Sequence, residues 1–167
     1  MRKVIRYSIW ESNSSSMHTL SVRGKRNVDS SYYPSNVNIE IRLDEYGWDG
    51  DPCDDFRSKL AYAMSMVLNT EYPEFHYYHE DDFVVDQDTL ESLDGYKLLL
   101  DAINKHVKCE RVIIKRKDNE YFPYGYIDHQ SYEDYGCLQD FLDDWNVDAE
   151  RFLFDDGVVV HIDNDNH

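Results

Sequence analysis

The sequence lacks the features that mark secreted and membrane-spanning proteins. Its three cysteines are odd in number and form no Cys-x-x-Cys pair, so we expect free thiols in a reducing compartment rather than a disulfide framework. No stretch approaches the roughly 20 consecutive apolar residues of a membrane span. The N-terminal residues do not resemble a signal peptide either. These absences favour a cytoplasmic protein without a membrane anchor.

Signature motifs of common enzyme classes are also missing. The chain has no glycine-rich phosphate-binding loop, no Gly-x-Ser-x-Gly elbow and no His-Glu-x-x-His pair. Asp163-Asn-Asp-Asn166 resembles a run of calcium ligands, but it lacks the glycine and the final glutamate of an EF-hand. We interpret it as a solvated terminus, and His76-Tyr-Tyr-His79 as an aromatic surface loop. No motif identifies a cofactor.

Basic residues are scarce, since 17 Lys and Arg face 34 Asp and Glu, for a formal net charge of −17. The first 26 residues are the exception, with six basic residues against Glu11 alone. Residues 128–167 carry twelve acidic residues against Arg151 alone. A field this negative repels nucleic-acid phosphates and attracts basic proteins. Nonspecific nucleic-acid binding is therefore disfavoured, and a basic host protein surface is the expected partner.

Apolar residues are present in ordinary proportion, at 41% of 167 residues. This is enough for a single domain over residues 1–167 with a buried core. Hydrophobic periodicity predicts an α+β fold with a mainly antiparallel sheet, two principal helices and one or two short C-terminal helices. The expected strands are Val4–Trp10, Met17–Val22, Val37–Leu43, Arg111–Lys117 and Gly157–Ile162. The expected helices are Asp54–Asn69, Thr89–His106 (capped by Asp88 with Glu91 in a capping box), Leu138–Asp144 and Val147–Phe152.

A first polar cluster lies at the tip of the basic hairpin formed by residues 1–26. Hydroxyls and backbone N–H groups in a tight turn can hold a phosphate, a neighbouring histidine can act as acid or base, and flanking arginines add positive charge. The alternative is an ordinary hairpin turn with a surface histidine. The candidate phosphate-binding residues are Arg6, Asn13, Ser14, Ser15, Ser16 and Arg23, with His18 as the candidate acid–base group.

A second polar cluster is Gly125-Tyr-Ile-Asp-His-Gln-Ser131. Asp128 and His129 are adjacent in a strand or loop, so we expect their side chains to point to opposite faces and not to pair with each other. We expect one of them to meet His18 or Asp163 instead. Imidazole and carboxylate groups also suit zinc or manganese, but the spacing matches no standard metal motif, and no metal ligand is assigned. The alternative is a polar loop with a hydrogen-bonded histidine.

These polar segments resemble a known group of sequences. Ile9-Trp-Glu-Ser-Asn-Ser-Ser-Ser-Met-His18 is similar to an N-terminal signature, F-E-T-N-S-S-S-x-H, of small uncharacterised proteins of bacteriophages and Gram-positive bacteria. Tyr46-Gly-Trp48, Gly125–Ser131 and Asn164-Asp-Asn166 resemble later parts of that family in the same order. Trp10 replaces Phe, and Ser12 replaces Thr. The resemblance implies a phage accessory protein in the bacterial cytoplasm, and it favours one shared site for the two polar clusters.

Two functions are the main alternatives from the sequence, and a virion or regulatory component without a pocket is a third. The first is a phage-encoded acidic inhibitor, comparable in composition to anti-CRISPR proteins and DNA mimics, which docks on a basic host defence or nucleic-acid-handling protein. The second is a hydrolase or transferase acting on a nucleotide or another phosphate-containing small molecule. Its catalytic residues would be His18, Asp128 and His129. The inhibitor predicts salt-sensitive binding, whereas the enzyme requires the two polar clusters to converge.

Overall fold

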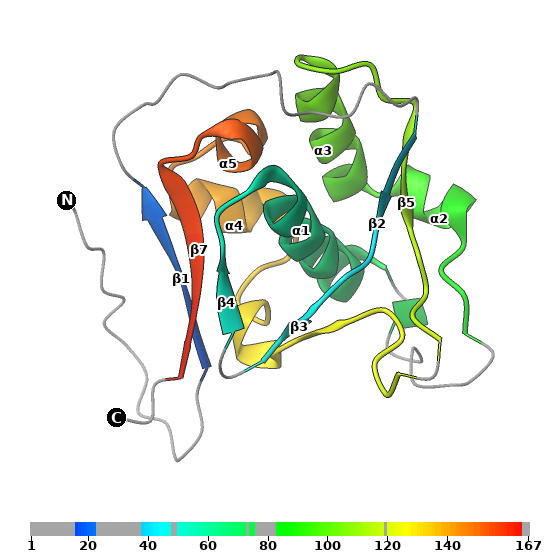
Figure 1. Cartoon of the computed structure of the whole chain (residues 1–167), viewed down its shortest axis with the longest axis horizontal. Helices are drawn as coiled ribbons and strands as arrows, with labels where there is room; N and C mark the ends of the chain where they lie inside the picture. Colours follow the sequence, from blue (N-terminus) through cyan, green and yellow to red (C-terminus); the bar gives the residue numbers. More distant parts are fainter. Residues whose placement is uncertain are drawn as a thin grey trace.

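A computed structural model describes residues 16–22, 38–47, 50–72, 74–75, 83–118 and 120–164, and only the backbone of residues 16–19, 130 and 163–164. Helix α1, Phe56–Glu71, runs through the middle of the fold (Figure 1). The Asp55 side chain caps it by accepting hydrogen bonds from the backbone N–H groups of Arg57 and Ser58, at 2.7 and 3.2 Å. An Asp at this position satisfies donors that have no partner within the helix.

Helix α1 is buried around most of its circumference. We expected one apolar face, and Leu60, Met64 and Val67 of that face are indeed buried. The side chains of Tyr62 and Met66, which point in other directions, are fully buried as well. A helix that is apolar on several sides must be covered on several sides. Helix α1 contacts three helices and two strands: α3 (Asp94–Asn104), α4 (Leu138–Asp144), α5 (Ala149–Phe154), β4 (Gly50–Cys53) and β6 (Tyr126–Ile127).

Two polar side chains on α1 join it to its neighbours. The buried Lys59 ammonium donates to the backbone oxygens of Asp155 and Val158, at 3.0 and 3.3 Å. The Glu71 carboxylate accepts from the N–H groups of Gly95 and Leu138, at 2.7 and 3.2 Å. Because these N–H groups lie in the first turns of α3 and α4, one carboxylate satisfies free donors at two helix N-termini.

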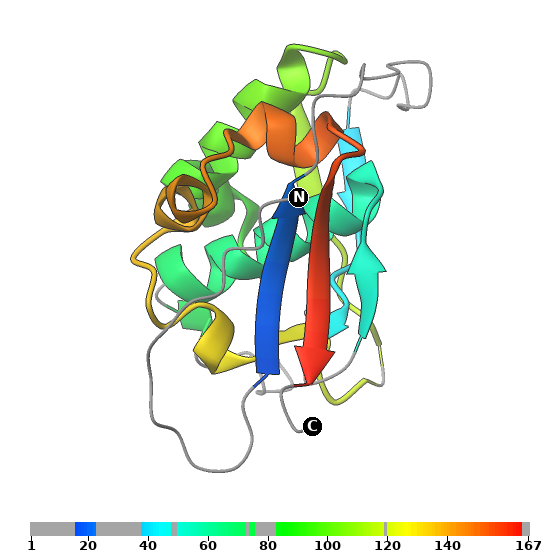
Figure 2. The same cartoon turned by 90° about the vertical axis from the view of Figure 1, so that its left-hand side faces the viewer.

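A three-stranded antiparallel sheet covers one side of α1. Its order is β1-β7-β4, and β1 pairs with β7 along its whole length, from Ser16 opposite Asn164 to Val22 opposite Val158. Figure 2 shows these two long strands face-on, with α1 behind them. The α+β class and the antiparallel sheet are confirmed. Strand Val4–Trp10 lies outside the described residues. The strands are β1 Ser16–Val22, β4 Gly50–Cys53 and β7 Val158–Asn164.

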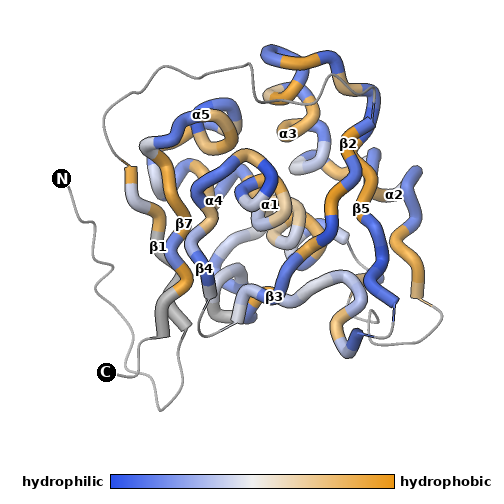
Figure 3. Tube along the Cα trace, in the orientation of Figure 1, coloured by the Kyte–Doolittle hydropathy of each residue, from blue (hydrophilic) through white to orange (hydrophobic). Residues whose placement is uncertain are grey.

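The remaining strands of the described residues form two short parallel pairs, which we did not predict from the sequence. Strand β2, Asn38–Ile41, pairs with β5, Arg111–Ile114, and β3, Glu45–Tyr46, pairs with β6, Tyr126–Ile127. The alternation of apolar and polar residues along Val37–Leu43 is visible as alternating hydropathy on β2 in Figure 3. On β2 the residues are alternately exposed and buried. Alternation fixes which side chains face inward but does not specify the partner strand. Helices α1–α3 supply the long crossover that a parallel pair needs.

The expected helix Thr89–His106 is two helices, α2 Gln87–Ser92 and α3 Asp94–Asn104, which meet at the extended Leu93. The predicted cap at Asp88 is wrong by two residues: Asp86 accepts from the Thr89 N–H and hydroxyl, at 2.8 and 2.6 Å. An acidic side chain at position 86 can thus accept two hydrogen bonds from Thr89, one from its backbone N–H and one from its hydroxyl. The C-terminal helices are α4 Leu138–Asp144 and α5 Ala149–Phe154. Among the described helices, none has the length and apolarity to cross a membrane.

All three cysteines are free thiols, as expected. Burial, with smaller contributions from the charges of Asp55 and Asp44, raises the pKa of the Cys53 thiol to about 12. Cys109 is also buried, and Cys137 is half-buried. Because the thiolate is the reactive form, Cys53 is not suited to nucleophilic chemistry at neutral pH.

We predict that Lys59→Ala destabilises the protein by about 2–4 kcal/mol, because it opens a cavity and leaves two buried carbonyl oxygens without a donor. Urea denaturation of both proteins measures the change. Lys97→Ala is the control, since Lys97 is exposed and makes only surface contacts, with the Asp94 carboxylate and the Ser92 backbone oxygen. Its loss should cost no more than about 0.5 kcal/mol. Equal effects of the two substitutions would contradict the role assigned to Lys59.

Candidate functional site

The Gly125–Ser131 segment is positioned by a glycine and a parallel strand pair. Gly125 has a φ of 71°, and a Cβ there would overlap the backbone oxygen of Asp44 and lie 2.8 Å from the Leu43 Cβ. This close approach lets the Tyr126 N–H donate to the Asp44 oxygen at 3.0 Å and the Asp128 N–H donate to the Tyr46 oxygen at 2.9 Å. The backbone of Asp128 is therefore fixed where β6 ends.

Asp128 and His129 form a pair, contrary to our expectation from the sequence. The Asp128 Oδ1 lies 3.0 Å from the His129 Nδ1. The expectation failed because strand β6 ends at Ile127 and a 3₁₀ turn, η3 His129–Ser131, begins immediately after Asp128. The alternation of an extended chain does not apply across this change of backbone conformation.

The two members of the pair differ sharply in burial. The side chain of Asp128 is 2% exposed, whereas that of His129 is 57% exposed. A carboxylate this close to Nδ1 favours the tautomer that carries its proton on Nδ1, so Nε2 is the nitrogen left for acid–base exchange. This arrangement suits general acid–base chemistry at the protein surface.

Further hydroxyl groups surround the pair. Burial, followed by the Asp128 charge, raises the pKa of Tyr126. Burial, with smaller contributions from Glu133, Tyr126 and Asp128, raises the pKa of Tyr132. Both phenols therefore keep their protons at neutral pH and remain hydrogen-bond donors. The buried Ser131 hydroxyl has no hydrogen-bond partner among the described residues.

The start of strand β1 lies beside this segment. Turn η3 contacts β1, and Figure 2 shows η3 (yellow) against the lower, N-terminal end of β1 (blue). Residues 13–15 of the first polar cluster immediately precede this end of the strand in the sequence. The fold thus brings the chain that leads out of the first polar cluster next to the second cluster.

The predicted residues of the first cluster are only partly described. Ser16 and His18 belong to β1, where their backbones are opposite Asn164 and Ile162. The remaining predicted phosphate-binding residues lie outside the described residues: Arg6, Asn13, Ser14, Ser15 and Arg23. The His76–His79 loop also lies outside them.

His161, a histidine of strand β7, is bound within the sheet. His161 Nε2 lies 2.9 Å from the Ser21 hydroxyl across the β1–β7 pair. Within the described ranges, no group of three or more His, Cys, Asp or Glu side chains is placed to hold a metal ion.

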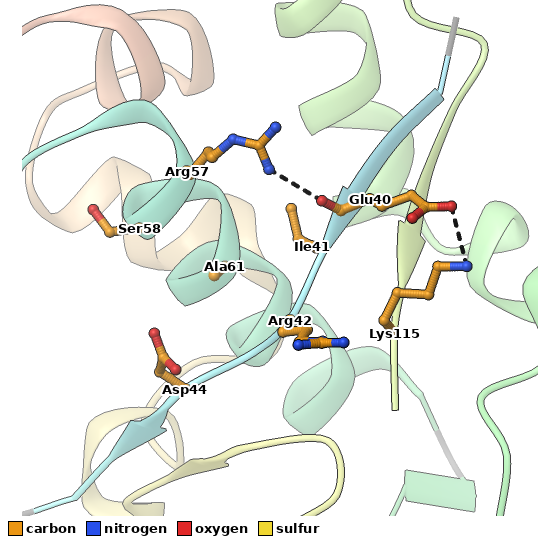
Figure 4. Close-up of a pocket in the computed structure, with 8 residues that line it drawn as sticks. All are labelled: Glu40, Ile41, Arg42, Asp44, Arg57, Ser58, Ala61 and Lys115. Carbon is orange, nitrogen blue, oxygen red and sulfur yellow. Dashed lines mark hydrogen bonds and ion pairs between the residues drawn. The ribbon is translucent and has the colours of Figure 1, made fainter. Parts of the chain in front are cut away.

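Sequence reasoning missed a second candidate site. A hollow of about 450 Å³ lies between β2 and the start of α1 (Figure 4). Arg42, Arg57 and Lys115 contribute to its lining. Arg42 and Lys115 are 73 positions apart in the sequence, so only the register of β2 with β5 could have indicated that they meet.

Comparison with protein-family models, with curated proteins and with solved structures found no match to this chain.

We predict that Gly125→Ala destabilises the protein by at least about 2 kcal/mol, because an added Cβ meets the backbone at Asp44 and a positive φ is unfavourable for alanine. Thermal and urea unfolding measure the effect. Gly47→Ala is the matched control, since its Cβ would come no closer than 3.9 Å to the Tyr126 ring and should change stability by about 0.5 kcal/mol or less. A neutral Gly125→Ala would show that the segment adapts without strain.

Proposed function

We propose that the protein is a hydrolase or transferase that acts on a nucleotide or another phosphate-containing small molecule. The observation that supports this most directly is the buried Asp128 carboxylate bound to Nδ1 of an exposed His129. Burying a carboxylate costs free energy, which interactions with the buried group must offset. Holding an imidazole in one orientation is a function that offsets this cost.

In this mechanism Asp128 orients His129, and the free Nε2 of His129 exchanges a proton with the reacting group. As a base, Nε2 takes the proton from an attacking water or hydroxyl whose oxygen forms a bond to phosphorus. The leaving oxygen then takes a proton as its bond to phosphorus breaks. His18 is the proposed second acid–base group. The Asn13–Ser16 tip, with Arg6 or Arg23, is the proposed phosphate cradle.

The contact between η3 and β1 supports a shared site, because a hydrolase needs the phosphate cradle and the acid–base group within reach of one ligand. Both segments resemble parts of one group of phage proteins, in the same order along the chain, and this resemblance favours the same proposal. It also favours a role in the bacterial cytoplasm during infection.

We expect His129→Gln to lower kcat/KM by about 10²–10⁴-fold and to leave the melting temperature unchanged, because the side chain is exposed. Hydrolysis of a panel of nucleotides and phosphate monoesters, followed as phosphate release, measures the activity. His106→Gln is the control, since His106 pairs with Glu150 away from this segment and should keep full activity. Turnover that survives His129→Gln, or a panel without a substrate, would refute the proposal.

The orientation role of Asp128 has its own readout. In the neutral wild-type protein the His129 proton should reside on Nδ1, as nitrogen-15 NMR of the ring reports. Asp128→Asn should remove this preference and lower kcat more than it changes KM. An unchanged tautomer in Asp128→Asn would mean that the pair does not orient the imidazole.

A second candidate function is the acidic inhibitor, and one surface favours it. Residues 118–150 contain ten Asp and Glu and no Lys or Arg. On α4 and the turn before it, the exposed carboxylates lie beside the half-buried side chains of Tyr132, Tyr135 and Trp145. Aromatic residues at a surface are typical of protein interfaces, and the charges would complement a basic partner. The carboxylates are Glu133, Asp134, Asp140, Asp143 and Asp144.

We predict that changing Asp140, Asp143 and Asp144 together to Asn abolishes salt-sensitive binding to basic nucleic-acid-handling host proteins. The substitutions keep the oxygen acceptors that bind the Gly136 N–H, Gln139 and the Tyr135 hydroxyl, so the fold should persist. Asp88, Asp94 and Asp101 changed together to Asn remove the same charge from other helices and form the control. Binding should compete with DNA and weaken as salt rises. If both triple variants lost the same binding affinity, net charge alone would explain the binding, and the surface on α4 would have no specific role.

A further inference from the structure

The hollow between β2 and α1 has the volume of a small-molecule site. Its volume is about 450 Å³, within the range of roughly 300–1,000 Å³ that ligand pockets occupy. Buried Ile41 and Ala61 form an apolar part of its wall. Figure 4 shows that the cationic side chains around it come from three elements: α1, the end of β2 and the end of β5.

The parallel register explains why the cations meet. Ile41 pairs with Ile114, so the next residues along both strands, Arg42 and Lys115, are neighbours, and the Lys115 N–H donates to the Ile41 oxygen at 2.8 Å. Because Ile41 and Ile114 face the core, Arg42 and Lys115 face outward. Arg57, in the first turn of α1, faces them across the hollow (Figure 4).

The carboxylates of this region are already paired with lysines. Glu40 Oε1 lies 3.1 Å from the Lys115 ammonium, and Asp44 Oδ1 lies 3.3 Å from the Lys117 ammonium. Three of the residues that line the hollow are basic (Arg42, Arg57 and Lys115) and two are acidic (Glu40 and Asp44), so the lining carries a charge of +1. This is a positive surface on a protein whose net charge is −17.

The excess positive charge of the hollow comes from the guanidinium groups of Arg42 and Arg57. Arg57 Nη1 donates to the backbone oxygen of Glu40 at 3.2 Å, which orients the group without neutralising it. Arg42 makes no hydrogen bond or ion pair with any residue in the described part of the chain. Carboxylates are abundant in so acidic a protein and could have paired with both guanidinium groups. Because neither guanidinium group at the rim of the hollow has a carboxylate partner, we infer that the hollow is an anion site.

The N-terminus of α1 does not itself provide the anion site. The N–H groups of Arg57 and Ser58 are bound to the Asp55 carboxylate, which would repel an anion placed there. The anion must therefore be held by the guanidinium groups, whose planar donors match the oxygens of a phosphate. The apolar wall is suited to a ring attached to that phosphate.

We propose that this hollow binds a small organic phosphate of nucleotide size, with Arg42 and Arg57 on the phosphate and with Ile41 and Ala61 against the ring. Neither Asp128 nor His129 lines the hollow, so the proposal does not rest on the activity proposed for that pair. The site would be a second, separate ligand-binding site on the same domain.

Titration calorimetry at low ionic strength with AMP, adenosine and inorganic phosphate tests the proposal on the full chain. AMP should bind. Adenosine should bind more weakly because it lacks the phosphate, and inorganic phosphate should bind more weakly because it lacks the ring. Arg42→Gln and Arg57→Gln should each weaken AMP binding by about tenfold or more, since each removes charge-assisted hydrogen bonds. Both side chains are exposed, so the melting temperature should not change.

Arg111→Gln is the matched control, because Arg111 is at the other end of β5 and pairs with Glu91. It removes the same charge and should change AMP affinity by no more than about twofold. His129→Gln should bind AMP at this site as the wild type does, even if it loses catalytic activity. An absence of AMP binding at millimolar concentration, equal binding of adenosine or inorganic phosphate, or an equal loss in Arg111→Gln would overturn the proposal.

Discussion

Burial of helix α1 is the constraint on which the other elements depend. A helix with apolar side chains on several sides is stable in water only when other elements cover those sides, and here α3, α4, α5 and the strands do so. Two polar contacts then fix the arrangement. Lys59 joins α1 to the turn before β7, and Glu71 joins the other end of α1 to the first turns of α3 and α4.

Both candidate sites are at the border of this packed core. Tyr46, which holds the Asp128 N–H through its backbone oxygen, packs its ring edge-on against Tyr62 of α1, with the ring centres 5.1 Å apart. The cationic hollow is between β2 and the first turns of the same helix. The core therefore provides rigid support for polar groups that are themselves exposed, which is how binding and catalytic groups are held with little loss of entropy on binding.

Local patterns in the sequence predicted much of the secondary structure. Strict alternation located β2, and α4 begins and ends at the predicted residues. The errors occurred where tertiary contacts decide. The expected helix Thr89–His106 is interrupted at Leu93, next to the Gly95 that packs against Glu71 and Val67. The Asp128–His129 pair was misjudged because a short turn replaced the extended backbone on which the alternation argument rested.

The sequence by itself determined the α+β class, the acidic character, the basic N-terminus and the two polar segments worth examining. These follow from composition and from periodicities of two and 3.6 residues, which act over a few neighbours. Only the tertiary structure decided that Asp128 is buried while His129 is exposed, that η3 lies against β1, and that Arg42, Arg57 and Lys115 surround one hollow. Such facts depend on which strands pair and in what register, and pairing between residues far apart in the chain is set by packing of the whole core.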